Sequence, residues 1–151
     1  RLDEWTLATD FIVGFPTEDE ADHETSMDLL REVRPERINV TRFSKRPNTD
    51  AAAMDGLGGQ TKKDRSKAMS ELKMDVVGEA YESLVGETRE VLVVAEGTGD
   101  SVKCRDGAYR QIIVQNAADH DVEVGDMLRV EVTDHNTVYA FADPALTRTP
   151  Q

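Results

Sequence analysis

The sequence predicts an α/β unit followed by an all-β unit, the second being a small five-stranded antiparallel β-barrel. Residues 7–84 alternate between short apolar runs and amphipathic stretches, the pattern of strands joined by helices. Residues 88–142 instead hold five short alternating segments separated by turns rich in Gly, Asp and Asn, which is typical of small barrels. We therefore expect one unit over residues 1–84, a second over 85–146 and a tail at 147–151.

The first strand is predicted over Leu7–Gly14, a short apolar run that stops before Pro16, as a buried parallel strand would. Thr17 and Glu20 match a capping box, which would begin the following helix. The helix would end at Pro35. Its predicted apolar stripe consists of Ala21, Met27, Leu30 and Val33.

A second strand over Ile38–Phe43 is indicated by β-branched residues in alternation. Because one helix joins the two strands, we expect parallel neighbours in a right-handed βαβ unit. The polar segment Ser44–Thr49 follows the carboxyl end of the second strand, the edge that carries the chemistry of α/β barrels. A glycine-containing loop then leads to a long helix over Thr61–Leu84. Two parallel strands leave apolar surface uncovered, so further strands are expected upstream in a longer chain.

The barrel strands are predicted at Thr88–Ala95, Val102–Arg105, Arg110–Gln115, Met127–Thr133 and Thr137–Ala142. Asp119, His120 and Asp121 are interpreted as a charged turn without a metal role. Cys104 is the single cysteine, and His23 lies far from the other two histidines, so no disulfide and no metal site is predicted.

The charge balance narrows the function classes. Asp and Glu total 30 against 18 Lys and Arg, which gives a net charge of −12. A protein that contacts nucleic acid normally needs a basic footprint. A high-salt cytoplasm would make an acidic surface tolerable through screening, so a halophilic source is expected, with an ordinary acidic cytosolic protein as the alternative. No apolar run is long enough to cross a bilayer, and we expect a cytoplasmic protein with no membrane partner.

Two stretches carry a resemblance to a known family. Thr9–Glu18 reads TDFIVGFPTE, and Ile38–Ala52 reads INVTRFSKRPNTDAA. They resemble the fifth strand, and the sixth strand with its loop, of the radical-SAM tRNA methylthiotransferases, although Thr17 and Asn48 replace glycines of the family pattern. The tail is similar to the RNA-binding TRAM domain that ends these enzymes, at Val85–Gly86, Val91, Tyr109–Arg110, Val124–Asp126 and Val130–Val132.

This resemblance implies the C-terminal part of a radical-SAM partial (β/α) barrel followed by an OB-like TRAM barrel. Such a parent enzyme converts N6-threonylcarbamoyladenosine next to the tRNA anticodon to its 2-methylthio derivative, using S-adenosylmethionine (SAM) and two 4Fe-4S clusters. The resemblance implies two partners, the tRNA anticodon stem-loop and the upstream domains of the same chain. The cluster motif C-x3-C-x2-C is missing here, so this piece is expected to hold no cluster ligand and no catalytic residue, and to be inactive alone.

Three alternatives stay open. The tail could be a stand-alone RNA-binding module without catalysis. The parent could instead modify isopentenyladenosine in tRNA, or a ribosomal protein. An acidic interaction protein without an RNA role is the third.

Four residues are candidates for SAM contact. The resemblance assigns Ile12 and Gly14 to the strand that touches the adenosyl group, and a glycine at a strand end lets a ligand approach the backbone. Arg46, with Ser44 in the same loop, could hold a carboxylate through its guanidinium fork. The plain alternatives are a buried strand end and a solvated arginine.

Four further residues are candidates for RNA contact. Lys103, Arg105 and Arg110 surround Tyr109 on one predicted hairpin. Basic side chains beside an aromatic ring offer RNA both phosphate contacts and a stacking surface. An ordinary hairpin with mixed charges is the alternative.

Overall fold

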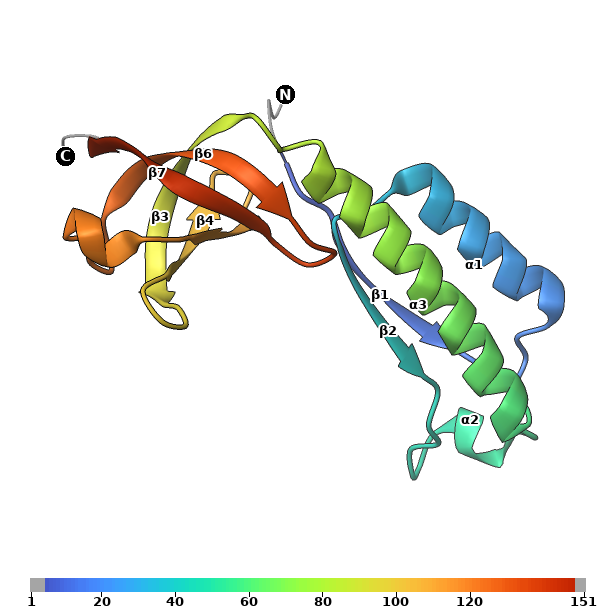
Figure 1. Ribbon diagram of the computed structural model, residues 1–151. Coiled ribbons are helices and arrows are strands. Elements are labelled where there is room, and N and C mark those ends of the chain that lie inside the picture. Colours follow the sequence, from blue (N-terminus) through green and yellow to red (C-terminus); the bar gives the residue numbers. More distant parts are fainter. Residues whose placement is uncertain (1–4, 149–151) are drawn as a thin grey trace. The chain divides into compact units, whose positions relative to one another are not determined.

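The computed structural model describes residues 5–148, and only the backbone of residues 145–148 (Figure 1). The chain divides into two compact units, one of residues 7–77 and one of residues 78–148 together with residues 5 and 6. Helix α3, Gly59–Glu82, contributes residues to both units. Among the described residues, no helix combines the length and the apolar character that crossing a membrane requires.

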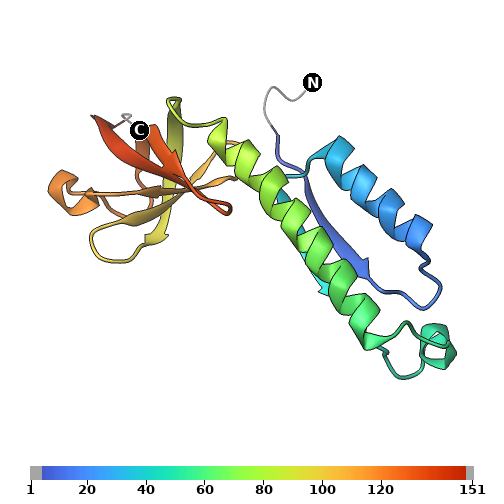
Figure 2. The ribbon, with the colours of Figure 1, turned by 45° about the vertical axis from the view of Figure 1, so that its right-hand side comes forward.

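The first unit is built on two parallel strands, as predicted. β1 (Ala8–Val13) pairs with β2 (Arg37–Arg42) in register from Ala8 opposite Arg37 to Val13 opposite Arg42. Helix α1 (Glu20–Val33) joins them, and both α1 and α3 run alongside the two strands (Figures 1 and 2). A short helix that was not predicted, α2 (Asp50–Ala53), follows β2. The buried apolar side chains of this unit are Val13, Met27, Leu30, Ile38, Met69, Val76 and Val77.

The predicted capping box of α1 is wrong, because the helix begins later. Asp19 is the N-cap, and its carboxylate accepts a hydrogen bond from Asp22 N at 2.9 Å while the Asp22 carboxylate accepts from Asp19 N at 3.1 Å. An aspartate at this position uses the same reciprocal geometry as a threonine–glutamate pair. Glu20 is thereby released from capping and pairs with Arg65 instead.

The buried face of α1 also differs from the predicted stripe. Met27 and Leu30 are buried, but Ala21 and Val33 are exposed, and His23 completes the face. Positions 23, 27 and 30 follow the spacing of one helical face. The helix ends at Val33, and Arg34 is its C-cap, with a left-handed backbone at φ 50° directly before Pro35.

The second unit is a closed five-stranded barrel, as predicted. Its strands are β3 (Thr88–Glu96), β4 (Val102–Asp106), β5 (Gln111–Val114), β6 (Met127–His135) and β7 (Ala140–Arg148), in the order β3-β4-β5-β7-β6. The prediction that the barrel is antiparallel throughout is wrong, since β5 and β7 pair in parallel. Strands that alternate in direction cannot close a ring of odd number without one parallel pair.

The barrel interior is filled by every second residue of each strand. The members with the least exposure are Val91, Val93, Cys104, Ile112, Val114, Val130, Val132, Ala140 and Ala142. A short 3₁₀ helix, Ala117–His120, lies between β5 and β6 where a charged turn was predicted. β7 begins at Ala140 rather than at Thr137, because Asn136 holds a turn whose backbone N–H groups at Val138 and Tyr139 donate to the Asn136 side chain.

Candidate functional site: a strand-end rim and a tyrosine hairpin

The first candidate region is the rim at the carboxyl ends of β1 and β2. Gly14 follows β1 with φ 81°, a conformation that side chains disfavour. An added Cβ there would clash with Lys62 Cγ. Gly14 N donates to Glu18 Oε2 at 2.8 Å. The turn therefore needs glycine both for its backbone angle and for the close approach of Lys62.

Glu18 is in turn held by Arg65 of α3. Arg65 Nη1 donates to Glu18 Oε1 at 2.8 Å and to Glu18 O at 3.1 Å, and Nη2 donates to Glu20 Oε2 at 2.8 Å. The Arg65 side chain is 9% exposed and that of Glu18 13%, whereas Glu20 is 82% exposed. Burial acts to lower the pKa of Arg65, but its hydrogen bonds to Glu18 and Glu20 raise that pKa above the ordinary value. Arg65 thus stays charged and anchors the loop after Gly14.

A cavity of about 540 Å³ opens at this rim. It is lined by Thr41, Arg42, Phe43, Ser44, Gly59 and Lys62. The ring of Phe43 meets that of Phe15 edge to face at 5.2 Å. Two cationic side chains and the Ser44 hydroxyl around one space are groups that can bind a carboxylate or phosphate.

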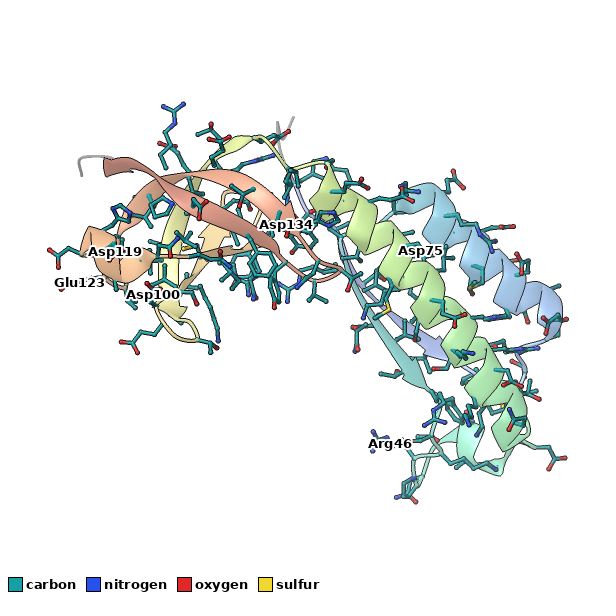
Figure 3. All side chains as sticks on the ribbon, in the orientation of Figure 1. Arg46, Asp75, Asp100, Asp119, Glu123 and Asp134 are labelled. Atoms are coloured by element: carbon teal, nitrogen blue, oxygen red, sulfur yellow. The ribbon has the colours of Figure 1, made fainter. Side chains whose placement is uncertain are left out.

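The predicted SAM residues are distributed unevenly over this rim. Ser44 lines the cavity and Gly14 lies beside Lys62, which also lines it. Ile12 is 61% exposed on β1. Arg46 is exposed in the loop after β2 and projects from it (Figure 3).

The loop that carries Arg46 is fixed by its neighbours. Lys45 Nζ donates to Ala52 O at 3.1 Å and to Met54 O at 2.7 Å, and Thr49 Oγ1 donates to Arg46 O at 2.9 Å. Asn48 has φ 62°, a region that asparagine tolerates better than most residues. The loop therefore presents Arg46 on a braced backbone.

Sequence reasoning missed Lys62, Glu18 and Arg65 at this rim. Lys62 and Arg65 lie on α3, far from the strand motifs in sequence. A signal in the sequence that could have identified them is Glu18, four positions after the strand-end Gly14. A carboxylate this close to a buried strand end needs a cation as its partner.

The second candidate region is the hairpin between β4 and β5. Tyr109 lies at its tip with φ 67° and is 62% exposed. The Arg105 guanidinium lies 4.8 Å from the centre of the Tyr109 ring, and its Nη1 donates to Tyr109 O at 3.3 Å. A left-handed tyrosine is conformationally costly, so the hairpin holds this ring outward at the expense of backbone strain.

Asp106 stabilises that strained turn from inside. Its Oδ1 accepts from Ala108 N at 3.1 Å and from Arg110 N at 2.8 Å, and Tyr109 N donates to Asp106 O at 2.9 Å. Its side chain is 1% exposed, with Arg89 Nη1 at 3.8 Å and Arg110 Nε at 3.7 Å from Oδ2. Two guanidinium groups thus neutralise one buried carboxylate.

The structure therefore separates the four predicted RNA residues. Lys103 is exposed on β4, Arg105 is half-buried against Tyr109, and Tyr109 is open to solvent. The Arg110 side chain is only 9% exposed and is directed at Asp106 rather than away from the barrel. Asp106, which sequence reasoning missed, explains this difference, because a buried carboxylate attracts the nearest cation inward.

Residues 5–148, which the structure describes, contain no cluster of three or more His, Cys, Asp or Glu side chains suited to a metal ion. Cys104 is buried in the barrel, and this burial raises the pKa of its thiol to about 12. A thiol that stays protonated is a poor nucleophile and a poor metal ligand.

Known proteins similar to this chain were found by sequence. A probable threonylcarbamoyladenosine tRNA methylthiotransferase of Methanothermobacter thermautotrophicus is 33% identical over 91% of this chain and 31% of its own length. A protein of the same description from Archaeoglobus fulgidus is 37% identical over 82% of this chain and 29% of its own length. A tRNA-2-methylthio-N(6)-dimethylallyladenosine synthase of Aquifex aeolicus is 37% identical over 68% of this chain and 23% of its own length.

Other comparisons add less. No protein-family model matches the chain. The solution structure of a conserved protein of Methanococcus maripaludis is 27% identical, covers 41% of this chain and 80% of that one, and has a TM-score of 0.34, too low to establish a shared fold. The chain spans about 30% of the length of the two archaeal relatives. On the sequence relationship, this chain is similar over most of its length to part of proteins named as tRNA methylthiotransferases.

Proposed function

We propose that this chain is the C-terminal part of a cytoplasmic enzyme that converts N6-threonylcarbamoyladenosine next to the tRNA anticodon to its 2-methylthio derivative. The observation that carries the proposal is the identity of 33% and 37% with two archaeal proteins named for the threonylcarbamoyladenosine reaction, over most of this chain. In this proposal the first unit contributes part of a SAM site and the barrel contributes RNA binding.

The residues of the rim fit SAM as a ligand. Gly14 turns the backbone at the carboxyl end of β1 beside Lys62, a residue that lines the cavity, and Glu18 with Arg65 keeps that backbone in place. Arg42, Ser44 and Lys62 line the adjoining cavity and can bind the SAM carboxylate. When bound, SAM would supply the methyl group and the radical that the reaction consumes. Arg46, at the edge of the same loop, is proposed to reach a carboxylate of SAM or of the threonylcarbamoyl group.

The donor set of this chain does not fit an iron–sulfur cluster. Clusters are held by several cysteine thiolates, and Cys104 is the single cysteine of the sequence. Its burial inside the barrel and its raised pKa also disfavour thiolate ligation. We therefore assign both clusters to upstream domains of the same parent chain.

The barrel is proposed to bind the anticodon stem-loop through its tyrosine hairpin. Tyr109 offers an exposed ring, and Arg105 and Lys103 offer cations on the preceding strand. Stacking on the ring and contacts to phosphate are the two interactions that such groups make with RNA. Arg110 would act indirectly, by holding Asp106 and with it the turn.

Nucleoside analysis tests this proposal. The full-length parent gene is placed in a strain that lacks the modification, and its tRNA nucleosides are analysed by mass spectrometry. We expect 2-methylthio-N6-threonylcarbamoyladenosine to appear, and Arg46→Ala to lower its level. If the product bears the dimethylallyl group instead, as the name of the Aquifex relative describes for that protein, the proposed substrate is wrong. If no methylthio nucleoside forms at all, the proposed function is refuted.

A further inference from the structure

A groove lies on the outside of the barrel, across β4, β5 and β7. The inward residues of these strands are buried, so their alternate neighbours point outward. Lys103 lies opposite Ile113, and Ile113 lies opposite Phe141, which makes one row over three adjacent strands. The groove, of about 600 Å³, covers this row. We call it the β4–β5–β7 groove; it is also lined by Asp100, Gln111, Gln115, Asn116 and Tyr139.

One wall of the groove is an aromatic pair. Tyr139 and Phe141 meet edge to face, with ring centres 5.2 Å apart and planes inclined by 78°. Both side chains are half-buried. The turn at Asn136 fixes the Tyr139 backbone, because Tyr139 N donates to Asn136 Oδ1 at 2.9 Å and Asn136 N donates to Tyr139 O at 2.9 Å. The rings are thus held in place before any ligand arrives, which lowers the entropy cost of stacking on them.

Three side-chain amides line the same groove. Among the hydrogen bonds within the described part of the chain, none engages the side chains of Gln111, Gln115 or Asn116. Each amide carries both donors and an acceptor. Charge contributes little, since Lys103 is balanced by Asp100, which lies on the loop that leads into β4 (Figure 3). A flat, uncharged ligand with donors and acceptors on its edge suits this lining better than a phosphate does.

We propose that the β4–β5–β7 groove binds an unstacked nucleobase of single-stranded RNA. The base stacks on the Tyr139–Phe141 pair, the amides hydrogen-bond its edge, and Lys103 contacts the adjoining phosphate. This inference rests on the proposed RNA role of the barrel and adds a base-binding site to it. The groove continues toward the tyrosine hairpin, because Gln111 lies opposite Arg105, so one RNA strand can reach both.

Binding through stacking and neutral hydrogen bonds should depend only weakly on salt concentration, which matters for a chain this acidic. Binding through phosphates weakens steeply with salt, whereas stacking and neutral hydrogen bonds do not release counterions. Two cations lie along the path, Lys103 and Arg105. Two phosphate contacts to a single strand correspond to a slope of about −1.4 in log K against log salt. The barrel would therefore retain RNA at high ionic strength despite the net charge of −12.

Fluorescence of a base analogue tests the groove directly. The probe is a short single-stranded RNA of adenosine and uridine with one 2-aminopurine, titrated with the full 151-residue chain; a duplex of the same sequence is the comparison. We expect the single strand to bind more tightly than the duplex and its 2-aminopurine to be quenched. Tyr139→Leu with Phe141→Leu should weaken binding by about 5- to 150-fold, the range for losing one stacked base, and remove the quenching.

Matched variants separate a local effect from misfolding. Tyr139→Phe and Phe141→Tyr keep the rings and should bind as the wild type does. Gln115→Ala should weaken binding while leaving the quenching, and circular dichroism checks that each variant keeps its fold. If the double leucine variant binds RNA and quenches the 2-aminopurine as the wild type does, the groove is not the base-binding site. In that case this inference fails, but the proposed RNA role of the barrel does not. If neither the single strand nor the duplex binds the wild-type chain, the proposed RNA role fails with it.

Discussion

Replacing Arg65 with methionine removes the cation that holds the rim while keeping much of its volume. The change deletes the hydrogen bonds to Glu18 Oε1 and to Glu20 Oε2, both at 2.8 Å, and leaves the Glu18 carboxylate, 13% exposed, without its charged partner. Removing one member of a buried ion pair costs about 3–5 kcal/mol. We expect about 3 kcal/mol, the lower end of that range, because Glu20 is 82% exposed and its ion pair adds little.

The assay is urea denaturation followed by circular dichroism of the helices, with the free energy of unfolding extrapolated to water. Arg31→Met is the matched control, since Arg31 also contacts two carboxylates, Glu24 at 2.8 Å and Asp28 at 2.7 Å, but is 47% exposed. Exposed ion pairs contribute little to stability, so Arg31→Met should hardly change the free energy of unfolding. Adding Glu18→Gln to Arg65→Met should recover part of the loss, because no uncompensated charge then stays buried. Equal losses at Arg65 and Arg31 would refute the reasoning.

Three further predictions concern the barrel and the charge of the chain. Asp106→Ala removes the buried carboxylate that faces Arg89 and Arg110 and that accepts from two backbone N–H groups of the turn, so it should cost about 3 kcal/mol; a thermal melt close to that of the wild type would contradict it. Burial raises the pKa of Cys104 from 9.0 to about 12, so the folded chain keeps a proton that the unfolded chain loses above pH 9. Stability should therefore fall by about 1.4 kcal/mol per pH unit as the pH rises from 9 toward 12, and Cys104→Ala should not show this slope; identical slopes would rule the cause out. Because the net charge is −12, added potassium chloride should raise the free energy of unfolding, and a flat or falling response would count against a halophilic origin.

The strands and the long helices could be predicted because each follows from local patterns. Apolar runs and β-branched alternation identified β1 and β2, and four-residue spacing identified α3. The parallel pairing of β7 with β5 could not be predicted from local sequence, because it depends on how an odd number of strands closes a ring. The predicted start of α1 was wrong for a different reason: two residue pairs could cap the helix, and the half-buried contacts of Glu18 with Gly14 N and Arg65 hold the residues before Asp19 outside the helix.

The candidate sites divide in the same way. The turn at Gly14 could be predicted because a strand-end glycine has a local backbone reason, here φ 81°; the contact of Gly14 with SAM stays a prediction. The burial of Arg110 could not, because it depends on Asp106 being enclosed by the barrel. Tyr139 and Phe141 carried a signal that was overlooked, namely two aromatic residues two apart around an alanine that faces the interior.

The central proposal is that the rim binds SAM and the barrel binds tRNA. The KM values of the reconstituted parent enzyme for SAM and for tRNA test it most directly. We expect Tyr109→Leu to raise the KM for tRNA and leave that for SAM unchanged, because the ring is exposed on the barrel hairpin. Arg42→Ala, in the rim cavity, should raise the KM for SAM. A rise in the KM for SAM with Tyr109→Leu, or no change of either constant with both variants, would contradict the account.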